Sequence, residues 1–178
     1  MTMTLSIEDV KAKIRAVPNF PKEGIIFRDI TTGIKDGKIM QFMIDYLCDQ
    51  YKDFKIDYIA GIESRGFIFG MPMAYKLGCG FIPIRKPNKL PAQTISESYG
   101  LEYGKDTIEI HTDAIEKGAN VLIVDDLLAT GGTAVAACNL VKRVGGNLVG
   151  VAFLIELKDL KGREKLSNCG KIVSMLEY

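Results

Sequence analysis

Two adjacent acids followed by a threonine- and glycine-rich turn form the strongest chemical pattern in the sequence. Asp125 and Asp126 follow the apolar run of residues 121–124. After them come Ala129, Thr130, Gly131, Gly132 and Thr133, and a helical pattern starts near residue 134. Such a turn directs backbone N–H groups and two hydroxyls to one place at the positive end of a helix dipole. This arrangement suits a phosphate monoester.

The two acids indicate a sugar rather than a nucleotide-hydrolysing site. Vicinal carboxylates can accept hydrogen bonds from two neighbouring ribose hydroxyls, and no lysine follows the glycines as a Walker A loop requires. The alternative is a tight β–α connection with solvated acids. Two adjacent acids at a buried strand end are costly without a partner, which favours the ligand site.

A second polar turn, Glu63-Ser64-Arg65-Gly66, follows another short apolar run. Gly61 and Gly66 have Walker A spacing, but a phenylalanine follows Gly66 where lysine is needed. Backbone N–H groups and the Arg65 guanidinium at a helix start would form a diphosphate cradle. The alternative is a structural helix start, with Ser64 as its cap and Arg65 paired with Glu63.

Three basic residues, Arg85, Lys86 and Lys89, stand at the start of a stretch that extends to about residue 104. The stretch is rich in Pro, Ser, Thr and Gly and has little apolar pattern, and a loop this long in a compact domain is usually functional or mobile. We expect a lid that closes over the site and excludes water. The alternative is a solvated surface loop.

The elements that must position these groups read as an α/β fold with a central parallel sheet flanked by helices. Apolar β-forming runs alternate with helical patterns at about 67–77 and 134–144. The runs are residues 58–61, 81–84, 121–124, 148–155 and 172–176. A capped helix from about Ser6, an extended stretch at 25–30 and an amphipathic helix at 38–51 precede them. Ligands of open α/β sheets bind at the carboxyl ends of the strands, where all three polar clusters fall.

Composition sets limits on the function. The 178 residues are 47% hydrophobic and carry 23 basic against 22 acidic side chains, so recognition of nucleic acid by bulk charge is not expected. His111 is the sole histidine and the four cysteines form no C-x-x-C pair, which excludes a multi-histidine or zinc-knuckle metal site. Neither a signal peptide nor an apolar run of membrane-spanning length is present, so we expect one cytoplasmic domain over residues 1–178.

Residues 121–133, VLIVDDLLATGGT, resemble the signature of the type I phosphoribosyltransferases at every position. The resemblance implies that the turn from Ala129 to Thr133 holds the 5′-phosphate of 5-phospho-α-ribosyl diphosphate (PRPP) and that Asp125 and Asp126 bind its ribose. It also implies that the diphosphate is bound by Glu63, Ser64, Arg65, Arg85, Lys86 and Lys89. Of these, Arg65 would also be catalytic.

Three further segments are similar to the adenine-specific members of that family: NFPKEGIIFRDI at 19–30, SYGLEYGK at 98–105 and VAFLIELKDLKGREKL at 151–166. The resemblance implies an N-terminal hood of about residues 1–35, in which Phe27 stacks on adenine and the backbone of Ile26 and Arg28 reads its edge. It further implies a flexible loop with Glu102 as a catalytic base and Tyr103 beside it. Without the resemblance, Phe27 would be read as a core residue and Glu102 as a solvated acid.

The implied reaction transfers the phosphoribosyl group of PRPP to N9 of adenine and gives AMP and diphosphate, a step of purine salvage. The cofactor would be Mg²⁺, held by substrate oxygens and water rather than directly by protein. The family suggests a homodimer, and no nucleic acid or membrane partner is expected. Two alternatives stay open: transfer to xanthine, guanine or hypoxanthine, and a PRPP-sensing regulator of the same fold, which would need a DNA-binding element or a basic face.

Overall fold

The computed structural model describes residues 5–100 and 104–178. The chain divides into two compact units, residues 1–46 and 47–178, and the boundary lies within helix α3 (Gly37–Asp49). The expectation of one domain with an N-terminal hood stays a prediction.

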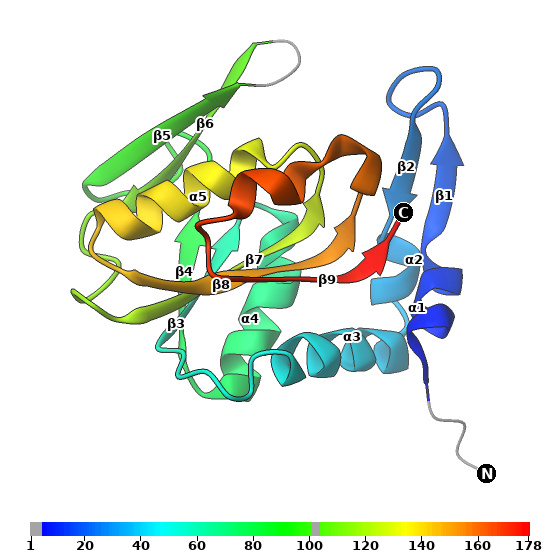
Figure 1. Ribbon diagram of the computed structural model, residues 1–178, viewed down its shortest axis with the longest axis horizontal. Coiled ribbons are helices and arrows are strands. Elements are labelled where there is room, and N and C mark those ends of the chain that lie inside the picture. The colour runs from blue at the N-terminus through cyan, green and yellow to red at the C-terminus, as the bar shows by residue number, and fades with distance from the viewer. Residues whose placement is uncertain (1–4, 101–103) are drawn as a thin grey trace. The chain divides into compact units, whose positions relative to one another are not determined.

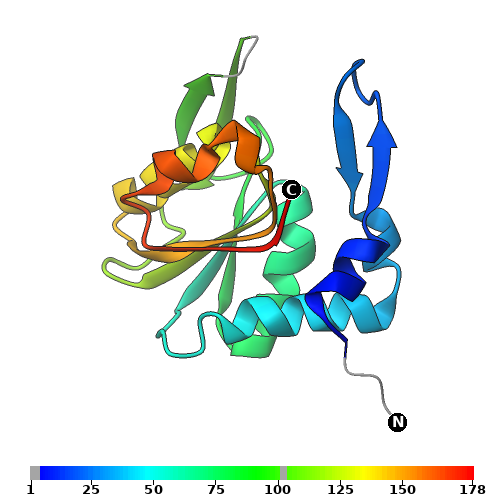
Figure 2. The ribbon, with the colours of Figure 1, turned by 45° about the vertical axis from the view of Figure 1, so that its right-hand side comes forward.

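The smaller unit consists of short elements around an antiparallel hairpin. They are α1 (Ile7–Lys13), β1 (Arg15–Pro18), β2 (Ile26–Asp29), α2 (Thr31–Ile34) and the first part of α3. Ser6 and Asp9 form a complete capping box at the start of α1, as the sequence predicts. The sequence did not indicate β1. Figure 2 shows the hairpin extending from α1 and α2.

The larger unit contains the predicted parallel sheet. Its five strands lie in the order β4-β3-β7-β8-β9 and all neighbours are parallel. They are β3 (Tyr58–Ile62), β4 (Gly80–Ile84), β7 (Asn120–Leu128), β8 (Asn147–Glu156) and β9 (Lys171–Glu177). Strand β7 is longer than the apolar run suggests and includes Asp125 and Asp126.

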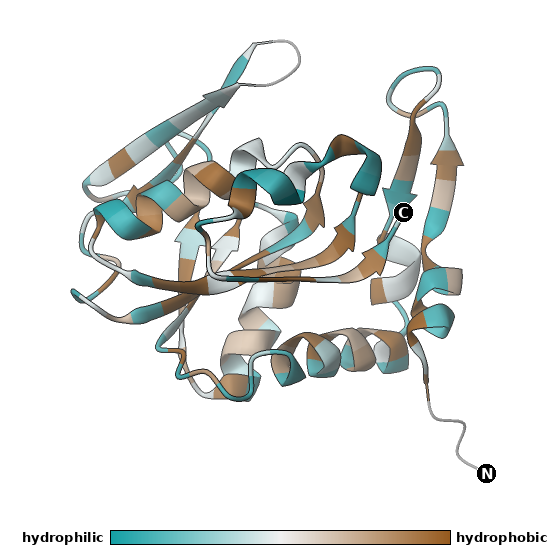
Figure 3. Cartoon of the chain, in the orientation of Figure 1, coloured by the Kyte–Doolittle hydropathy of each residue, from teal (hydrophilic) through white to brown (hydrophobic). Residues whose placement is uncertain are grey.

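Helices α4 (Arg65–Leu77) and α5 (Gly132–Arg143) cover opposite faces of this sheet (Figure 1). Because both faces are covered, residues 121–124 are all fully buried, and the strands are apolar along most of their length (Figure 3). Helix α4 ends at Gly78 with φ +67°, the left-handed conformation that glycine adopts without strain. Two 3-10 turns, η1 (Lys158–Leu160) and η2 (Gly162–Leu166), connect β8 to β9.

The stretch predicted as a lid loop is in part a second hairpin. Strands β5 (Thr94–Gly100) and β6 (Lys105–His111) pair antiparallel and extend beyond the sheet (Figure 1). The prediction of a loop up to residue 104 was wrong for β5, because its polar side chains conceal a period-two pattern. Ile95 pairs with the buried Ile110 of β6, and this cross-strand contact sets the register. No helix within residues 5–100 and 104–178 has the length and apolar character that crossing a membrane requires.

Tyr51 connects the C-terminal side of α3 to the sheet, and its loss should be measurable. Its fully buried hydroxyl lies 3.0 Å from the carbonyl oxygen of Val151 and 2.8 Å from that of Lys171. We expect Tyr51→Phe to lower the free energy of unfolding by about 1 kcal/mol in urea titration, because the carbonyls lose a buried donor. Tyr75→Phe, at a side chain that is 91% exposed, is the control and should leave stability unchanged. Equal stability of the two variants would contradict the prediction.

Candidate active site

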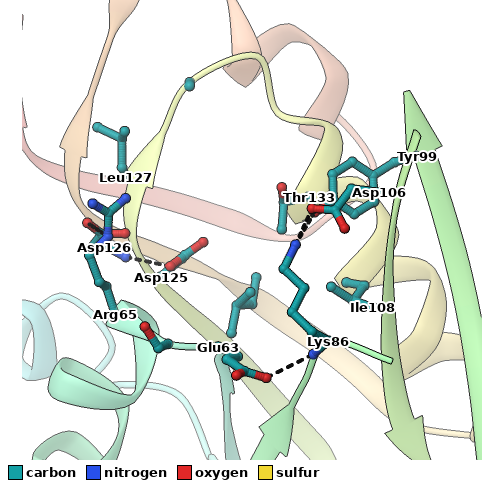
Figure 4. Close-up of a pocket in the computed structure, with 13 residues that line it drawn as sticks. Glu63, Arg65, Lys86, Tyr99, Asp106, Ile108, Asp125, Asp126, Leu127 and Thr133 are labelled. Atoms are coloured by element: carbon teal, nitrogen blue, oxygen red, sulfur yellow. Dashed lines mark hydrogen bonds and ion pairs between the residues drawn. The ribbon is translucent and has the colours of Figure 1, made fainter. Parts of the chain in front are cut away.

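A cavity of about 280 Å³ lies at the carboxyl edge of the sheet. Figure 4 shows the side chains that converge on it. Its lining residues come from all three polar clusters and from the hairpin β5–β6: Ile62, Glu63, Ser64, Arg65, Lys86, Tyr99, Asp106, Ile108, Asp125, Asp126, Leu127, Ala129 and Thr133. The fold therefore gathers segments that are more than sixty positions apart in the sequence.

Asp125 and Asp126 differ in their surroundings although they are neighbours in β7. Asp126 is 4% exposed and its Oδ2 lies 2.8 Å from Nε of Arg65, the first residue of α4. Asp125 is partly exposed, and its Oδ1 accepts the N–H of Asp126 at 2.8 Å. Burial and the adjacent Asp126 carboxylate raise the pKa of Asp125 well above its usual range. Burial also raises the pKa of Asp126, and the Arg65 guanidinium opposes this shift.

This arrangement excludes one reading of the second cluster. Arg65 pairs with Asp126 of β7, the strand next to β3, instead of with Glu63 two residues earlier. Ser64 stands at the N-cap position of α4 without a side-chain capping bond. Close packing brings α4 to the acids, since a Cβ on Gly66 would lie 2.6 Å from the carbonyl oxygen of Val124.

Residues 129–133, which we call the phosphate loop, surround a second cavity of about 60 Å³ next to the first. Gly131 is the N-cap of α5 and has φ +82°, and no side-chain capping bond is found there in the described part of the chain. Thr130, Gly131, Gly132, Thr133 and Ala134 all line this small cavity, and Thr133 lines both. The positive end of α5 and two threonines thus border a space that can take a phosphate group.

Glu63 binds two residues of the third polar cluster, Arg85 and Lys86. Its carboxylate accepts the guanidinium of Arg85, with Nε 3.1 Å from Oε2, and the backbone N–H of Lys86 at 2.9 Å. Burial acts to raise the pKa of Glu63, but these two donors outweigh it and the pKa is lowered. The N–H of Glu63 itself donates to the carbonyl of Ile84. Glu63 therefore holds the basic segment in place, and the loop amides that can face a ligand begin at Ser64.

Sequence reasoning missed two residues of the site, both on the hairpin. The ammonium of Lys86 donates to the carboxylate of Asp106 on β6, and its Nζ lies 3.4 Å from the hydroxyl of Tyr99 on β5. Burial acts to raise the pKa of Asp106, but Lys86, the N–H of Thr107 and Tyr99 together lower it. The alternation of Ile108 and Ile110 with polar residues was the signal for this strand, and it would have placed Asp106 on the same face as Ile108.

The comparisons with known proteins agree with this geometry. The phosphoribosyl transferase domain family matches residues 33–176. The chain is 57% identical over 170 residues to the adenine phosphoribosyltransferase of Trichodesmium erythraeum, which covers 96% of this chain and 99% of that protein. The chain belongs to the adenine phosphoribosyltransferase family.

Solved structures of this family have the same fold. The adenine phosphoribosyltransferase of Thermoanaerobacter pseudethanolicus superposes with a TM-score of 0.94 at 50% identity, over 97% of this chain and 100% of that one. The Saccharomyces cerevisiae enzyme, solved with adenine and an imino-altritol bisphosphate, gives a TM-score of 0.90 at 43% identity, over 96% and 98% of the two chains. The predicted type I phosphoribosyltransferase fold is confirmed.

Not every residue that the resemblance to adenine phosphoribosyltransferases selects can be placed at the two cavities. Arg85 and Lys89 line neither; Arg85 is bound to Glu63, and its NH1 donates to the Lys89 carbonyl at 3.3 Å. Ile26, Phe27 and Arg28 belong to β2 of the smaller unit. Glu102 and Tyr103 lie outside the described residues.

The side chains near the cavity that could bind a metal ion can be compared with the needs of Mg²⁺, the ion expected for an adenine phosphoribosyltransferase. The described residues contain no cluster of three or more His, Cys, Asp or Glu side chains. Asp125 is the one carboxylate of the pair that is not bound to arginine, since Asp126 is paired with Arg65. This set fits Mg²⁺ that keeps most of its ligands from water and substrate oxygens.

Proposed function

We propose that this chain transfers the 5-phosphoribosyl group from PRPP to N9 of adenine, releasing AMP and diphosphate. The observation that carries the proposal is that the phosphate loop, the vicinal acids and two cations, Arg65 and Lys86, line two adjacent cavities. These three groups match the three parts of PRPP. The base is supported by the names of the relatives and by the adenine bound to the yeast enzyme.

The donor would bind with its phosphate at the N-terminus of α5. Thr130, Thr133 and the loop amides would hold the 5′-phosphate, and the Asp125 and Asp126 carboxylates would accept the ribose hydroxyls. C1 and the diphosphate would then lie next to Ser64, Arg65 and Lys86, which line the same cavity. Two carboxyl groups beside two cations suit a ligand that has both hydroxyls and phosphates.

The bond to be broken joins C1 to the diphosphate oxygen, which leaves with the electron pair. Positive charge then develops on the ribose and negative charge on the leaving group. Arg65 and Lys86 would stabilise the diphosphate, while Asp125 and Asp126 would stabilise the ribose ring. N9 of adenine forms the new bond to C1 and loses its proton, for which the resemblance proposes Glu102 as general base.

Mg²⁺ is the proposed cofactor. Bound to the diphosphate, it would neutralise charge on the leaving group. Asp125 is the residue that would contact it, through water, because Asp126 is held by Arg65.

The base site is assigned to the hairpin β1–β2 by resemblance. Phe20 and Phe27 pack edge to face with ring centroids 5.3 Å apart, and Ile26 is 52% exposed, so the hairpin presents apolar surface that can stack on a purine. We expect Phe27→Ala to raise the KM for adenine about tenfold, the loss of one stacking partner, without changing the Kd for PRPP. Phe54→Ala, at an exposed phenylalanine outside the hairpin, is the control. An unchanged KM for adenine in Phe27→Ala would remove Phe27 from the base site.

The test of the proposal is an acceptor panel. Purified protein with PRPP and Mg²⁺ is given adenine, hypoxanthine, guanine or xanthine in turn, and the nucleotide product is measured. Formation of AMP from adenine, with little product from the other bases, is the expected result. Preference for another base would assign a different purine substrate. No product from any base, with binding of PRPP and of DNA in a titration at moderate salt, would indicate a regulator instead.

Two further assignments accompany the proposal. The family suggests a homodimer, which light scattering on the purified protein tests directly. A cytoplasmic site of action stays a prediction from the sequence.

A further inference from the structure

The 3-10 turn η2, which lies outside both cavities, is anchored by an arginine with an unusually complete set of partners. Nε of Arg163 lies 3.0 and 3.1 Å from the two carboxylate oxygens of Glu156, and NH2 also donates to this carboxylate. NH1 donates to the carbonyl of Ile172 at 3.1 Å, and NH2 to the hydroxyl of Ser174 at 3.1 Å. Arg163 therefore ties η2 to the last residue of β8 and to the first half of β9.

Glu156 makes this anchor specific. It is 5% exposed at the last position of β8, and the Arg163 guanidinium lowers its pKa. A buried carboxylate requires a charged, hydrogen-bonded partner. The planar fork of arginine supplies two donors to the carboxylate and others to β9, which lysine does not reproduce.

The residue before Arg163 touches the back of the phosphate loop. A Cβ built on Gly162 would lie 2.2 Å from the carbonyl oxygen of Ala129 and 2.9 Å from the N of Gly131. In the other direction, a Cβ on Gly131 would lie 2.6 Å from the carbonyl oxygen of Gly162. The two backbones are thus in direct contact, with no room for a side chain between them.

We propose that Gly162 and Arg163 are positioning residues for the 5′-phosphate. The inference rests on the proposed function, because it assigns the phosphate loop to the phosphate of PRPP. Backbone N–H groups bind phosphate well only when their directions are held, and a loop with adjacent glycines has much conformational freedom to lose. Contact with Gly162 restricts the loop from behind, and the Arg163–Glu156 pair holds Gly162 against it.

Arg163 acts through this contact and not on the ligand. Its guanidinium donors are directed to Glu156, Ile172 and Ser174, and it lines neither cavity. Substitutions of Gly162 and Arg163 should therefore weaken binding at the 5′-phosphate end of PRPP alone. Binding of ribose 5-phosphate should depend on Gly162 and Arg163, whereas binding of free diphosphate, at Ser64, Arg65 and Lys86, should not.

The experiment compares the Kd of these two compounds by titration calorimetry in the full-length protein with Mg²⁺. We expect Gly162→Ala to weaken ribose 5-phosphate binding at least about tenfold, because displacing a binding group by about 1 Å is enough for such a loss. Arg163→Met should weaken it at least about fivefold, and Arg163→Lys should fall between Arg163→Met and the unmodified protein. The Kd for diphosphate should stay within twofold in all three variants.

Two control variants carry the same kinds of substitution at sites that do not contact the phosphate loop. Gly37→Ala adds a methyl group at a glycine of α3 that has open space around it. Lys158→Met removes a cation from η1, the neighbouring turn, where Lys158 pairs with Glu177 at 2.8 Å on the exposed surface. Both controls should bind the two compounds as the unmodified protein does.

Circular dichroism and thermal melting accompany each titration. Unchanged ribose 5-phosphate binding in folded Arg163→Met and Arg163→Lys overturns the proposal, and so does an equal loss of both ligands, which would indicate a general structural role. If Gly162→Ala does not fold, the proposal is tested by the Kd values of the two Arg163 variants for ribose 5-phosphate and diphosphate. If the unmodified protein binds neither compound, the proposed function itself fails, a result distinct from variants that bind normally.

Discussion

Replacing both adjacent acids, Asp125→Asn with Asp126→Asn, is expected to raise the Kd for PRPP at least about a hundredfold. Each carboxylate would accept a hydrogen bond from a ribose hydroxyl, and bonds to a charged partner contribute about 1.5–3 kcal/mol each. Loss of two such bonds corresponds to about 3–6 kcal/mol, and a hundredfold change in Kd to about 2.7 kcal/mol. Calorimetric titration with PRPP measures it. Unchanged affinity would remove both acids from the ribose site.

Although loss of the acids should weaken PRPP binding, the single variant Asp125→Asn should increase the stability of the protein without ligand. The pKa of Asp125 is raised in the folded state, so folding is opposed at any pH where the unfolded chain already carries this charge. The destabilisation is absent below the ordinary value of 3.8, grows as pH rises from there towards the folded-state pKa, and is constant above it.

Asparagine removes this charge, and Asp125→Asn should therefore be more stable than the unmodified protein at pH 7, with a smaller difference at pH 3. Urea unfolding at the two pH values measures this. Asp53→Asn, at an exposed acid outside the cavity, is the control and should change stability by less than about 0.5 kcal/mol. An Asp125→Asn protein that is less stable at pH 7 would contradict the argument.

Arg65→Met is expected to lower kcat about a hundredfold or more. Its guanidinium lies at the start of α4 beside the cavity, where negative charge develops on the leaving diphosphate, and loss of one such donor typically costs about 10²–10³ in rate. Arg65→Lys keeps the charge without the fork and should retain more activity than Arg65→Met. The readouts are kcat with adenine and the Kd for diphosphate. A kcat within threefold of the unmodified enzyme would exclude Arg65 from catalysis.

Arg65 has a second effect that a pH profile reveals. Its guanidinium acts against the burial that raises the pKa of Asp126, so removal of Arg65 should raise that pKa further. Asp126 is then protonated at a higher pH, and the acidic limb of kcat/KM for PRPP should move to higher pH in Arg65→Met. In Arg65→Lys, which keeps a positive charge, the limb should move less. An unmoved limb in Arg65→Met would show that Asp126 does not control donor binding.

The parts of the site that could be predicted are those encoded in short continuous segments. Residues 121–133 contain a strand, two acids, a turn and a helix start, and each follows from local preferences for apolar β-formers, glycine and hydroxyl residues. The turn at Glu63, Ser64 and Arg65 was found in the same way. Its pairing was not, because the choice of Asp126 over Glu63 as the partner of Arg65 depends on how closely α4 packs on β7.

The hairpin β5–β6 could not be predicted from the local sequence pattern. Strand β5 contains two serines, a glutamate and a glycine among its seven residues, and these residue types are depleted in strands or common in loops. Its strand conformation is supported by pairing with β6, through contacts such as Ile95 with Ile110. The pairing of these two strands brings Tyr99 and Asp106 to the site and into contact with Lys86, and a single segment of sequence does not show this pairing.

The amino-acid sequence by itself determined the α/β class, the phosphate loop and the acids that follow the buried run, because secondary structure and turn chemistry depend on neighbouring residues. The tertiary structure alone decided which charges meet: Arg65 with Asp126, Arg85 with Glu63, Lys86 with Asp106 and Arg163 with Glu156. It also placed Gly162 against Gly131, which lies 31 positions earlier in the chain. Charge pairing and backbone contact depend on distance in space, which strand order and helix packing determine and local sequence does not.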